Sequence, residues 1–307
     1  MTKIFIDGSA GTTGLRIADR LAARPDIALL RLAEEVRKDP NARKDAICSA
    51  DVAFLCLPDA AAMEAVALVG DADTKIIDTS TAHRVNPAWA YGFPELAGQR
   101  QKILSSNRIA NPGCHASGFI ALVAPLVENG IIPKDLLLQS FSLTGYSGGG
   151  KKMIAEYEDP NRNSLLQGPR QYGLTQQHKH LKEMVKICGL HNAPAFCPIV
   201  ADFYSGMEVT VPLFASQING TIDTIRALYR DYYQEGLVRY CDDTDPDGLL
   251  SAAAYSGRDD MQVSVHGNEE RILLTSRFDN LGKGASGAAI QNMNILLGLP
   301  EDTGLNV

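Results

Sequence analysis

The stretch KIFIDGSAGTTG, residues 3–14, joins a short apolar run to a turn with three glycines. Residues 3–7 have the length and apolar content of a buried strand, and residues 15–23 have amphipathic helical spacing. Backbone amides at such a junction can bind a pyrophosphate, although a tight turn without a ligand would need similar residues and the spacing is GxxGxxG, not GxGxxG. We predict a dinucleotide site at Gly8, Ser9, Gly11, Thr12, Thr13 and Gly14.

Strands and helices continue to alternate after this turn. The pattern predicts a helix over 59–69 and strands over 27–32, 51–57 and 75–78. Alternating strands and helices are typical of βαβ units and a parallel sheet. We therefore expect an α/β protein whose first domain is a Rossmann-type, parallel-sheet dinucleotide-binding domain formed by residues 1–113 and 284–307.

The pattern of predicted strands and helices changes beyond about residue 113. Longer alternating strands are predicted over 136–143, 195–200, 206–215 and 270–278, and helices over 116–128, 175–188, 221–234 and 285–297. Alternation of this kind indicates an antiparallel sheet with helices on one face. We expect an α+β substrate and dimerisation domain over 114–283 with a mainly antiparallel sheet, and a last helix that returns to the first domain.

Composition excludes several classes of protein. The chain has 307 residues, of which 45% are hydrophobic and 21% charged, and no apolar stretch reaches the roughly 18 to 20 residues of a membrane span. A formal net charge of −7 without a basic face argues against nucleic acid as a partner. Asp7 and the glycine turn interrupt any secretory leader, so we expect a cytoplasmic protein without a membrane partner. The six cysteines are scattered and suggest neither a disulfide framework nor a metal site.

The residues after the second strand bear on the choice of cofactor. An acidic residue there suits the ribose of NAD, whereas a basic one suits the phosphate of NADP. Arg31, with Thr12 and Thr13, favours NADP, but Glu34 and Glu35 are close enough to keep NAD open. A solvated charged edge without any ligand would look the same.

Cys114 differs from the other cysteines because Asn111-Pro112-Gly113 places it on a turn immediately before a helix that is expected to start near His115 or Ala116. The positive end of a helix favours the thiolate, which attacks carbonyl carbons. The alternative is an inert thiol at a helix cap. A nucleophilic thiol beside a nicotinamide predicts oxidation or reduction at the acyl level, which also needs an acid-base group.

Histidine is the side chain best suited to that proton transfer near neutral pH. His178 and His180 lie together in QQHKHLKEM, at the start of a predicted helix, so only one of them is expected to face the site. His180 is the first choice and His178 the alternative. A histidine pair among lysines is also typical of a solvated helix face.

Seven segments together resemble the N-acetyl-γ-glutamyl-phosphate reductase family, a branch of the semialdehyde dehydrogenases, in its shorter form. They span essentially the whole chain: GSAGTTG at 8–14, DTSTAHR at 78–84, YGFPEL at 91–96, NPGC at 111–114, TGYSGGGKK at 144–152, HKHLKE at 178–183 and KGASGAAIQNMN at 283–294. The resemblance implies NADPH-dependent reduction of N-acetyl-γ-glutamyl phosphate to N-acetylglutamate 5-semialdehyde, with release of phosphate. It implies that Cys114 forms a thioester and that His180, or His178, is the acid-base residue.

The resemblance also implies roles for other residues. Arg84 would hold the leaving phosphate, and Ser147 and Asn111 would lie on the substrate side. The remaining cofactor contacts would be made by Ser80, Gly148, Gly149, Asn280 and Gln291. If these residues bind no ligand, Arg84 would form a salt bridge at a loop and the glycines would belong to a flexible loop. Enzymes of this kind commonly associate through the second domain, so a homodimer or homotetramer is expected.

Three positions depart from the family pattern on the substrate side. Phe93 replaces a leucine, His115 replaces a common tyrosine, and lysines follow the glycine loop where arginine is frequent. Aspartyl phosphate and the one-carbon-longer N-acetylaminoadipyl phosphate are therefore alternative substrates. NPGC and YGFPEL argue against the aspartyl branch, whereas one methylene changes selectivity by only about 1 to 3 kcal/mol. The alternative from a different class of function is a protein that binds NADPH as a sensor and has no catalytic activity.

Overall fold

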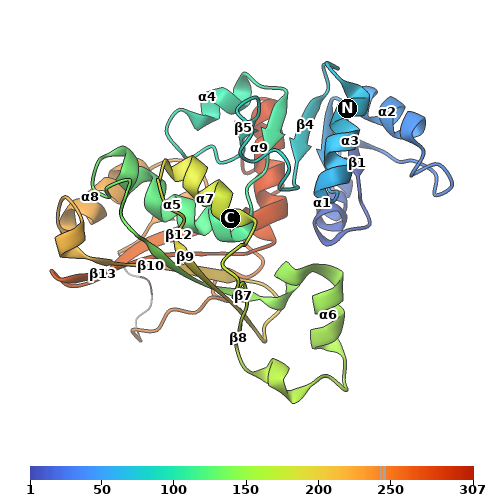
Figure 1. The fold of residues 1–307 in the computed structure, drawn as a ribbon. Helices are drawn as coiled ribbons and strands as arrows, with labels where there is room; N and C mark the ends of the chain where they lie inside the picture. Colours follow the sequence, from blue (N-terminus) through green and yellow to red (C-terminus); the bar gives the residue numbers. More distant parts are fainter. Residues whose placement is uncertain (243, 245–246) are drawn as a thin grey trace. The chain divides into compact units, whose positions relative to one another are not determined.

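The computed structural model describes residues 1–242, 244 and 247–307. The chain forms two compact units (Figure 1). The first unit comprises Met1–Pro112 and Ala285–Leu305, and the second comprises Gly113–Gly284 with Asn306–Val307. Asn306 lies in the second unit, not the first, because its amide donates to Asp259 and its carbonyl accepts from the Asp259 amide.

The first unit is built on a sheet in the order β2-β1-β3-β4-β6-β5, with parallel pairing between neighbours. Its strands are β1 (Thr2–Asp7), β2 (Ile27–Leu30), β3 (Val52–Leu55), β4 (Lys75–Asp78), β5 (Ala90–Tyr91) and β6 (Arg108–Ala110). Its helices are α1 (Thr12–Ala22), α2 (Pro40–Cys48), α3 (Asp59–Val69), α4 (Gln99–Leu104) and α9 (Gly287–Leu296). The prediction of a parallel, Rossmann-type sheet is confirmed.

Both faces of this sheet are covered, which explains why its strands read as continuous apolar runs. Alternate residues of a strand point to opposite faces. Phe54 accordingly packs with α1 and α9, whereas Ala53 and Leu55 pack with α2 and α3. The β3 segment is buried along its whole length. The covered faces leave the ends of the strands as the places where a ligand can reach the sheet.

The second unit contains a mixed sheet in the order β11-β12-β13-β10-β7-β9-β8. Its strands are β7 (Gln139–Gly145), β8 (Arg170–Gln171), β9 (Ala195–Ala201), β10 (Met207–Phe214), β11 (Val238–Tyr240), β12 (Met261–Gly267) and β13 (Arg271–Phe278). Its α-helices are α5 (Cys114–Glu128), α6 (Gly150–Glu158), α7 (His180–Cys188) and α8 (Ile222–Tyr232). The pairing is mainly antiparallel, as predicted, but β7 with β9 and β11 with β12 are parallel.

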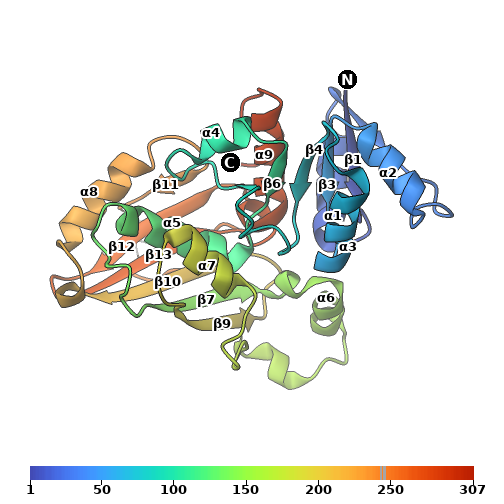
Figure 2. The ribbon, with the colours of Figure 1, turned by 45° about the horizontal axis from the view of Figure 1, so that its top comes forward.

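Three helices, α5, α7 and α8, cover one face of this sheet (Figure 2). Ser142 points to that face because it contacts α5, so its neighbours Phe141 and Leu143 point to the other. The opposite face carries exposed apolar side chains, including Phe141 and Leu273. No helix among the described residues has both the length and the apolar content of a membrane span.

Several predicted boundaries are wrong in ways that matter for the site. The expected strand over 136–143 begins only at Gln139. The helix expected from 116 begins at Cys114, which is therefore its first residue and not part of the preceding turn. The helix expected from 285 begins as a π-helical turn at Gly282–Ser286 and continues as α9.

Candidate active site

The glycine turn of the first unit is held by close contacts between backbone segments. Gly8 has a φ of +88°, and a Cβ there would lie 2.3 Å from the carbonyl oxygen of Cys56. A Cβ on Gly14 would lie 2.5 Å from the carbonyl oxygen of Gly8. A Cβ on Gly11 would meet nothing nearer than 3.6 Å. The fold therefore requires glycine at 8 and 14, whereas the surroundings of Gly11 leave room for a side chain.

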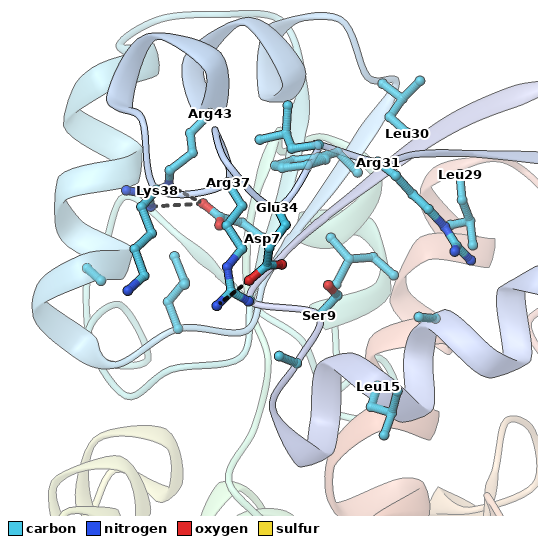
Figure 3. Close-up of a pocket in the computed structure, with 18 of the residues that line it drawn as sticks. Asp7, Ser9, Leu15, Leu29, Leu30, Arg31, Glu34, Arg37, Lys38 and Arg43 are labelled. Carbon is cyan, nitrogen blue, oxygen red and sulfur yellow. Dashed lines mark hydrogen bonds and ion pairs between the residues drawn. The ribbon is translucent and has the colours of Figure 1, made fainter.

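A cavity of about 650 Å³ opens beside this turn, at the carboxyl ends of β1 and β2 (Figure 3). Ligands of open parallel sheets bind at this edge. Residues that line the cavity include Gly8, Ser9, Leu15, Leu29, Arg31, Glu34, Arg37, Lys38 and Arg43. Thr12 and Thr13 begin α1 and do not line the described cavity, which leaves their expected contact with an NADP phosphate without support there.

The basic residues at the cavity differ in their partners. Arg43 is buried, and its Nη2 and Nε lie 2.9 and 3.0 Å from one carboxylate oxygen of Asp7. Burial raises the pKa of Asp7, and the contacts with Arg43 oppose that rise. Arg37 pairs with Glu34 at 2.9 Å. Within the described chain, Arg31 and Lys38 make no ion pair or side-chain hydrogen bond, so they are the cations available to an anionic ligand.

Two buried side chains organise the loop after β4. The Ser80 hydroxyl donates to a carboxylate oxygen of Asp78 at 2.8 Å. Arg84 donates from Nε to the Asn111 carbonyl and from Nη2 to the Thr79 carbonyl, at 2.9 Å each. Arg84 therefore braces the loop against the segment that leads to Cys114, and its expected contact with phosphate stays a prediction.

Asn111 and Gln291 are likewise buried and hydrogen-bonded within the first unit. The Asn111 amide donates to the Ala285 carbonyl at 3.0 Å. The Gln291 amide donates to the carboxylates of Glu95 and Glu301, at 2.8 Å each. These contacts give both residues a structural role, and their expected ligand contacts stay predictions.

Cys114 opens α5 in the second unit, where it is half-buried. The preceding amide, that of Gly113, donates to Glu183 of α7 at 2.8 Å, which fixes the start of α5 against the neighbouring helix. A Cβ on Gly284 would lie only 2.9 Å from the Cβ of Cys114. The Gly284 backbone therefore packs directly on the thiol-bearing residue.

The loop that carries Gly284 is held by a fully buried carboxylate. Asp279 accepts from the amides of Leu281 and Gly282 at 2.6 and 3.2 Å, and from the Ser205 hydroxyl at 2.9 Å. A loop with its amides fixed in this way keeps Gly284 against Cys114. The role of Asp279 could not be predicted from the sequence, because its contact with Ser205 joins residues that are distant in the chain.

The two candidate histidines lie side by side, with ring centroids 4.7 Å apart. Helix α7 begins at His180, not at 175, because Gln176 has a φ of +56° and its side chain bonds to the main chain of Phe196. His178 precedes the helix, and its Nδ1 accepts from the His180 amide at 3.3 Å. The premise that both histidines lie on one helix is therefore wrong, and the expectation that only one of them faces the site stays a prediction.

Other side chains missed by the sequence analysis complete this cluster. The His115 ring lies 5.7 Å from the rings of both His178 and His180, and Tyr172 bonds to His115. Glu183 could have been predicted from the sequence, because it lies three residues after His180 on the same helix face. Tyr172 could not have been predicted, because its position depends on the pairing of β8 with β9.

The glycine loop after β7 is anchored by Asn280. The Asn280 amide donates to the Ser147 hydroxyl at 3.0 Å and accepts from the Gly206 amide at 2.9 Å. Gly148 is exposed, and a Cβ there would have no neighbour nearer than 3.5 Å, whereas one on Gly149 would meet Met153 at 2.5 Å. Asn280 thus positions this loop, and cofactor contacts of Gly148 and Gly149 stay predictions.

Both units of the chain match known protein families. The family described as semialdehyde dehydrogenase, NAD binding domain, matches residues 3–105, and the semialdehyde dehydrogenase dimerisation domain matches residues 114–280. N-acetyl-gamma-glutamyl-phosphate reductase 2 of Nostoc sp. strain PCC 7120 is 46% identical, with 99% of each chain covered. The Brucella ovis N-acetyl-gamma-glutamyl-phosphate reductase is 45% identical over 96% of this chain and 99% of its own.

Solved structures share the fold at lower identity. Aspartate semialdehyde dehydrogenase II of Vibrio cholerae, in complex with ASA, has a TM-score of 0.72 at 16% identity and covers 97% of this chain and 98% of its own. The Candida albicans aspartate semialdehyde dehydrogenase with NADP has a TM-score of 0.67 at 14% identity, covering 97% and 99%. The first unit is thus a nicotinamide dinucleotide-binding domain. On the identity to its curated relatives, the chain belongs to the N-acetyl-γ-glutamyl-phosphate reductase family of semialdehyde dehydrogenases.

Proposed function

We propose that this protein reduces N-acetyl-γ-glutamyl phosphate to N-acetylglutamate 5-semialdehyde with NADPH, releasing phosphate, in arginine biosynthesis. The observation that carries the proposal is Cys114 at the first position of α5, with Gly284 packed on its Cβ and the histidine cluster in the same unit. The relatives that bear this activity in their names align over nearly the whole chain. The expected cytoplasmic location stays a prediction from the sequence.

The proposed chemistry assigns the covalent step to Cys114. The thiolate attacks the acyl carbon, the bond to phosphate breaks, and a thioester forms as inorganic phosphate leaves with the electron pair of that bond. The N-terminus of α5 stabilises the negative charge on sulfur before the attack. When bound, the nicotinamide cofactor supplies the hydride that reduces the thioester carbon. His180 donates a proton to the thioester oxygen as the hydride adds and takes it back as the hemithioacetal collapses, which releases the aldehyde and regenerates the thiolate.

His180 is the acid-base residue in this proposal. It is buried at the first position of α7, and its amide is capped by the Nδ1 of His178. That contact uses one ring nitrogen of His178, and burial, with a smaller effect of Lys179, lowers the pKa of His178. His178 therefore suits a capping role. We expect His180→Asn to lower kcat by about 100-fold or more, and His178→Asn to have a smaller effect.

The test is phosphate-dependent reduction of NADP by N-acetylglutamate 5-semialdehyde, with Cys114→Ser beside the native enzyme. Turnover should fall by about a thousand-fold or more in the variant, because serine is a far weaker nucleophile. Cys241→Ser is the matched control, since Cys241 is also half-buried in the second unit. Retained turnover in Cys114→Ser would overturn the assignment of the nucleophile.

Parallel assays with other aldehydes address the substrate. Aspartate semialdehyde and the one-carbon-longer N-acetylated semialdehyde should be poorer substrates by kcat/KM. A preference for either would replace the proposed substrate while leaving the reaction type intact. Absence of turnover with all three, in a protein that still binds NADPH, would favour the catalytically silent sensor.

We also propose that the cofactor is NADPH, with its 2′-phosphate bound by Arg31 and Lys38. Both line the cavity at the carboxyl end of β2, and the other lining cations, Arg37 and Arg43, already have carboxylate partners. Glu34, one of the two acidic residues that kept NAD open, pairs with Arg37. The double substitution Arg31→Ala, Lys38→Ala should raise the Kd of NADPH by at least about 10-fold and leave that of NADH nearly unchanged. Equal losses for both would contradict the assignment.

The open face of the second sheet is proposed as the contact of a homodimer or homotetramer. The matched dimerisation domain spans this sheet, and Phe141 and Leu273 are 39% and 42% exposed on it. Leu273→Glu should lower the mass measured by light scattering, because a carboxylate would be buried in the contact. An unchanged mass would place the contact elsewhere.

A further inference from the structure

One fully buried aromatic ring packs against two glycines that belong to distant parts of the second unit. Phe278 is the last residue of β13, which pairs with β10 on one side and with β12 on the other. A Cβ on Gly118 of α5 would lie 2.8 Å from Cε1 of this ring, and a Cβ on Gly284 would lie 3.2 Å from Cε2. The two ε carbons of the ring therefore face the main chains of two different segments.

The first glycine sets how deeply α5 lies on the sheet. Gly118 is buried one helical turn after Cys114, in the interior of the helix, where glycine is destabilising relative to alanine and calls for a packing reason. A Cβ there would lie 2.5 Å from Cγ2 of Val209 and 2.8 Å from Oγ of Ser276, in addition to its contact with Phe278. The helix therefore lies as close to the sheet as its main chain permits, and the ring is part of the surface beneath it.

The second glycine connects the same ring to the residue that bears the thiol. A Cβ on Gly284 would lie 2.9 Å from the Cβ of Cys114. Cys114 is therefore held at two points, through its helix at Gly118 and at its own Cβ by Gly284, and both glycines pack on Phe278. Leucine at position 278 would not replace the ring, because its side chain ends at the δ carbons and lacks the ε carbons that reach the glycines.

We propose that Phe278 is a positioning residue whose ring fixes the Cys114 sulfur for attack on the acyl carbon. The inference rests on the proposed role of Cys114 as the nucleophile. Protein interiors are close-packed and transmit strain, so a smaller side chain at this point allows the main chains that pack on it to move. A nucleophile displaced by about 1 Å loses roughly 100-fold in rate. The ring therefore acts on kcat and leaves the ionisation of the thiol to the first turn of α5.

The test compares Phe278→Leu with the native enzyme in the phosphate-dependent assay. We expect kcat to fall about 10-fold, through a displacement of the sulfur by less than 1 Å, and the Kd of NADPH to stay within about twofold. The midpoint pH of Cys114 alkylation by iodoacetamide, followed by mass spectrometry of its peptide, should move by no more than about 0.3 pH unit, since the thiol stays at the helix N-terminus. Native kcat would overturn the proposal. A larger shift of the midpoint would also overturn it, because the ring would then act on the charge of the sulfur.

Phe119→Leu is the matched control. Phe119 is also fully buried and lies in α5 itself, but adjacent residues of a helix point in different directions, and a Cβ on Gly284 would meet other atoms first. Thermal unfolding should show a loss of stability similar to that of Phe278→Leu, with kcat within about twofold of the native value. An equal fall of kcat in both variants would mean that any loss of packing in this core lowers the rate, which would overturn the specific role of Phe278.

A double-mutant cycle tests the contact between the ring and the helix. Gly118→Ala should lower kcat about 10-fold, because the new methyl group would push α5 away from the sheet. In the Phe278→Leu background the same change should cost only about threefold, because part of the ring that it meets has been removed. If the two losses simply multiply, the contact between Gly118 and Phe278 does not position Cys114 and the proposal is wrong.

A milder variant keeps the proposal testable if alanine at 118 prevents folding. The side chain of Phe278→Met is long and unbranched, and methionine fills irregular gaps, so kcat should fall by no more than about threefold. A loss as large as that of Phe278→Leu would show that filling this space does not matter. Turnover that survives Cys114→Ser would contradict the proposed function itself, whereas an inactive Cys114→Ser with native kcat in Phe278→Leu would contradict only this inference.

Discussion

The glycine turn of the first unit (residues 8–14) and the cysteine elbow of the second, which is Cys114 with the residues packed around it, both begin a helix, but they present different groups to a ligand. The turn offers main-chain amides and exposed cations such as Arg31 and Lys38. The elbow offers a thiol next to two buried side chains with hydrogen bonds of their own. His115 bonds to the hydroxyls of Ser142 and Tyr172, and Glu183 accepts from the Gly113 amide. Screening by solvent weakens exposed charges, whereas buried contacts are neither screened nor easily replaced. Substitutions at the elbow should therefore have larger effects than substitutions of charges at the cavity.

Among the substitutions that compare these two regions without removing a reacting group, Gly284→Ala should have the largest effect. The new Cβ would lie 2.9 Å from the Cys114 Cβ and 3.1 Å from the Asp279 carbonyl oxygen, so one of these backbones must shift. A displacement of the nucleophile by about 1 Å costs roughly 100-fold in rate. We expect kcat to fall by that factor, measured in the phosphate-dependent assay.

The matched control for this substitution is Gly168→Ala. Gly168 lies in the same unit, and a Cβ there would meet no atom within 4 Å. It should retain native kcat, and both variants should bind NADPH with native affinity, since the glycine turn is in the other unit. Native kcat in Gly284→Ala would show that the elbow tolerates movement and would weaken the contrast between the two regions.

The glycine turn provides the next test, through two of its own residues. Gly8→Ala should lower the free energy of unfolding by roughly 2 to 3 kcal/mol, because its φ is +88° and the Cβ would meet the Cys56 carbonyl. Gly11→Ala should leave stability within about 1 kcal/mol, because it has room. It should nevertheless raise the Kd of NADPH about 10-fold if the pyrophosphate approaches the turn closely. Thermal unfolding and fluorescence titration separate these effects, and native affinity in Gly11→Ala would place the pyrophosphate elsewhere.

A buried neutral imidazole also predicts a pH dependence of stability. The pKa of His115 is about 3 in the folded protein and about 6.5 when unfolded, so stability is complete above pH 6.5 and is lost as pH falls toward 3. Between pH 7.5 and 5.0 the native protein should lose roughly 2 kcal/mol more than His115→Leu. Urea unfolding at the two pH values measures the difference. Equal losses of stability in the two proteins would mean that His115 takes up a proton while the protein stays folded.

The parts of the fold that the sequence predicted are those specified by local patterns. Gly8 and Gly14 indicated the strand, turn and helix because both lie in one short turn between an apolar run and an amphipathic one. The contact that excludes a side chain at Gly14 is with Gly8 itself, whereas the one at Gly8 is with Cys56 and could not be predicted from neighbouring residues. Cys114 was found for the same reason, through the Asn-Pro-Gly elbow that precedes it. The interpretation of His178 as helical failed because the backbone of Gln176 and its bonds to β9 are set by tertiary contacts.

The cofactor cavity and the hydrogen bonds of His115 could not be predicted from the sequence, for a related reason. Arg37 and Lys38 reach the cavity from the segment between β2 and α2, a helix that was not predicted. Tyr172 reaches His115 from 57 residues away. Periodicity and motifs identify residues by their neighbours in the chain, so groups joined only by sheet pairing give no local signal.

The smallest effect is expected from the exposed ion pair at the cavity. Glu34 and Arg37 are 72% and 46% exposed, and a pair in such a position contributes little to stability. Glu34→Gln should leave the melting temperature unchanged and release Arg37 toward an anionic ligand. The Kd of NADPH should then fall about two- to threefold at low salt and by less at 0.2 M salt, because screening shortens the reach of the charge. A salt-independent gain, or one of 10-fold or more, would show that this rim behaves like the buried elbow and would remove the distinction between the two regions.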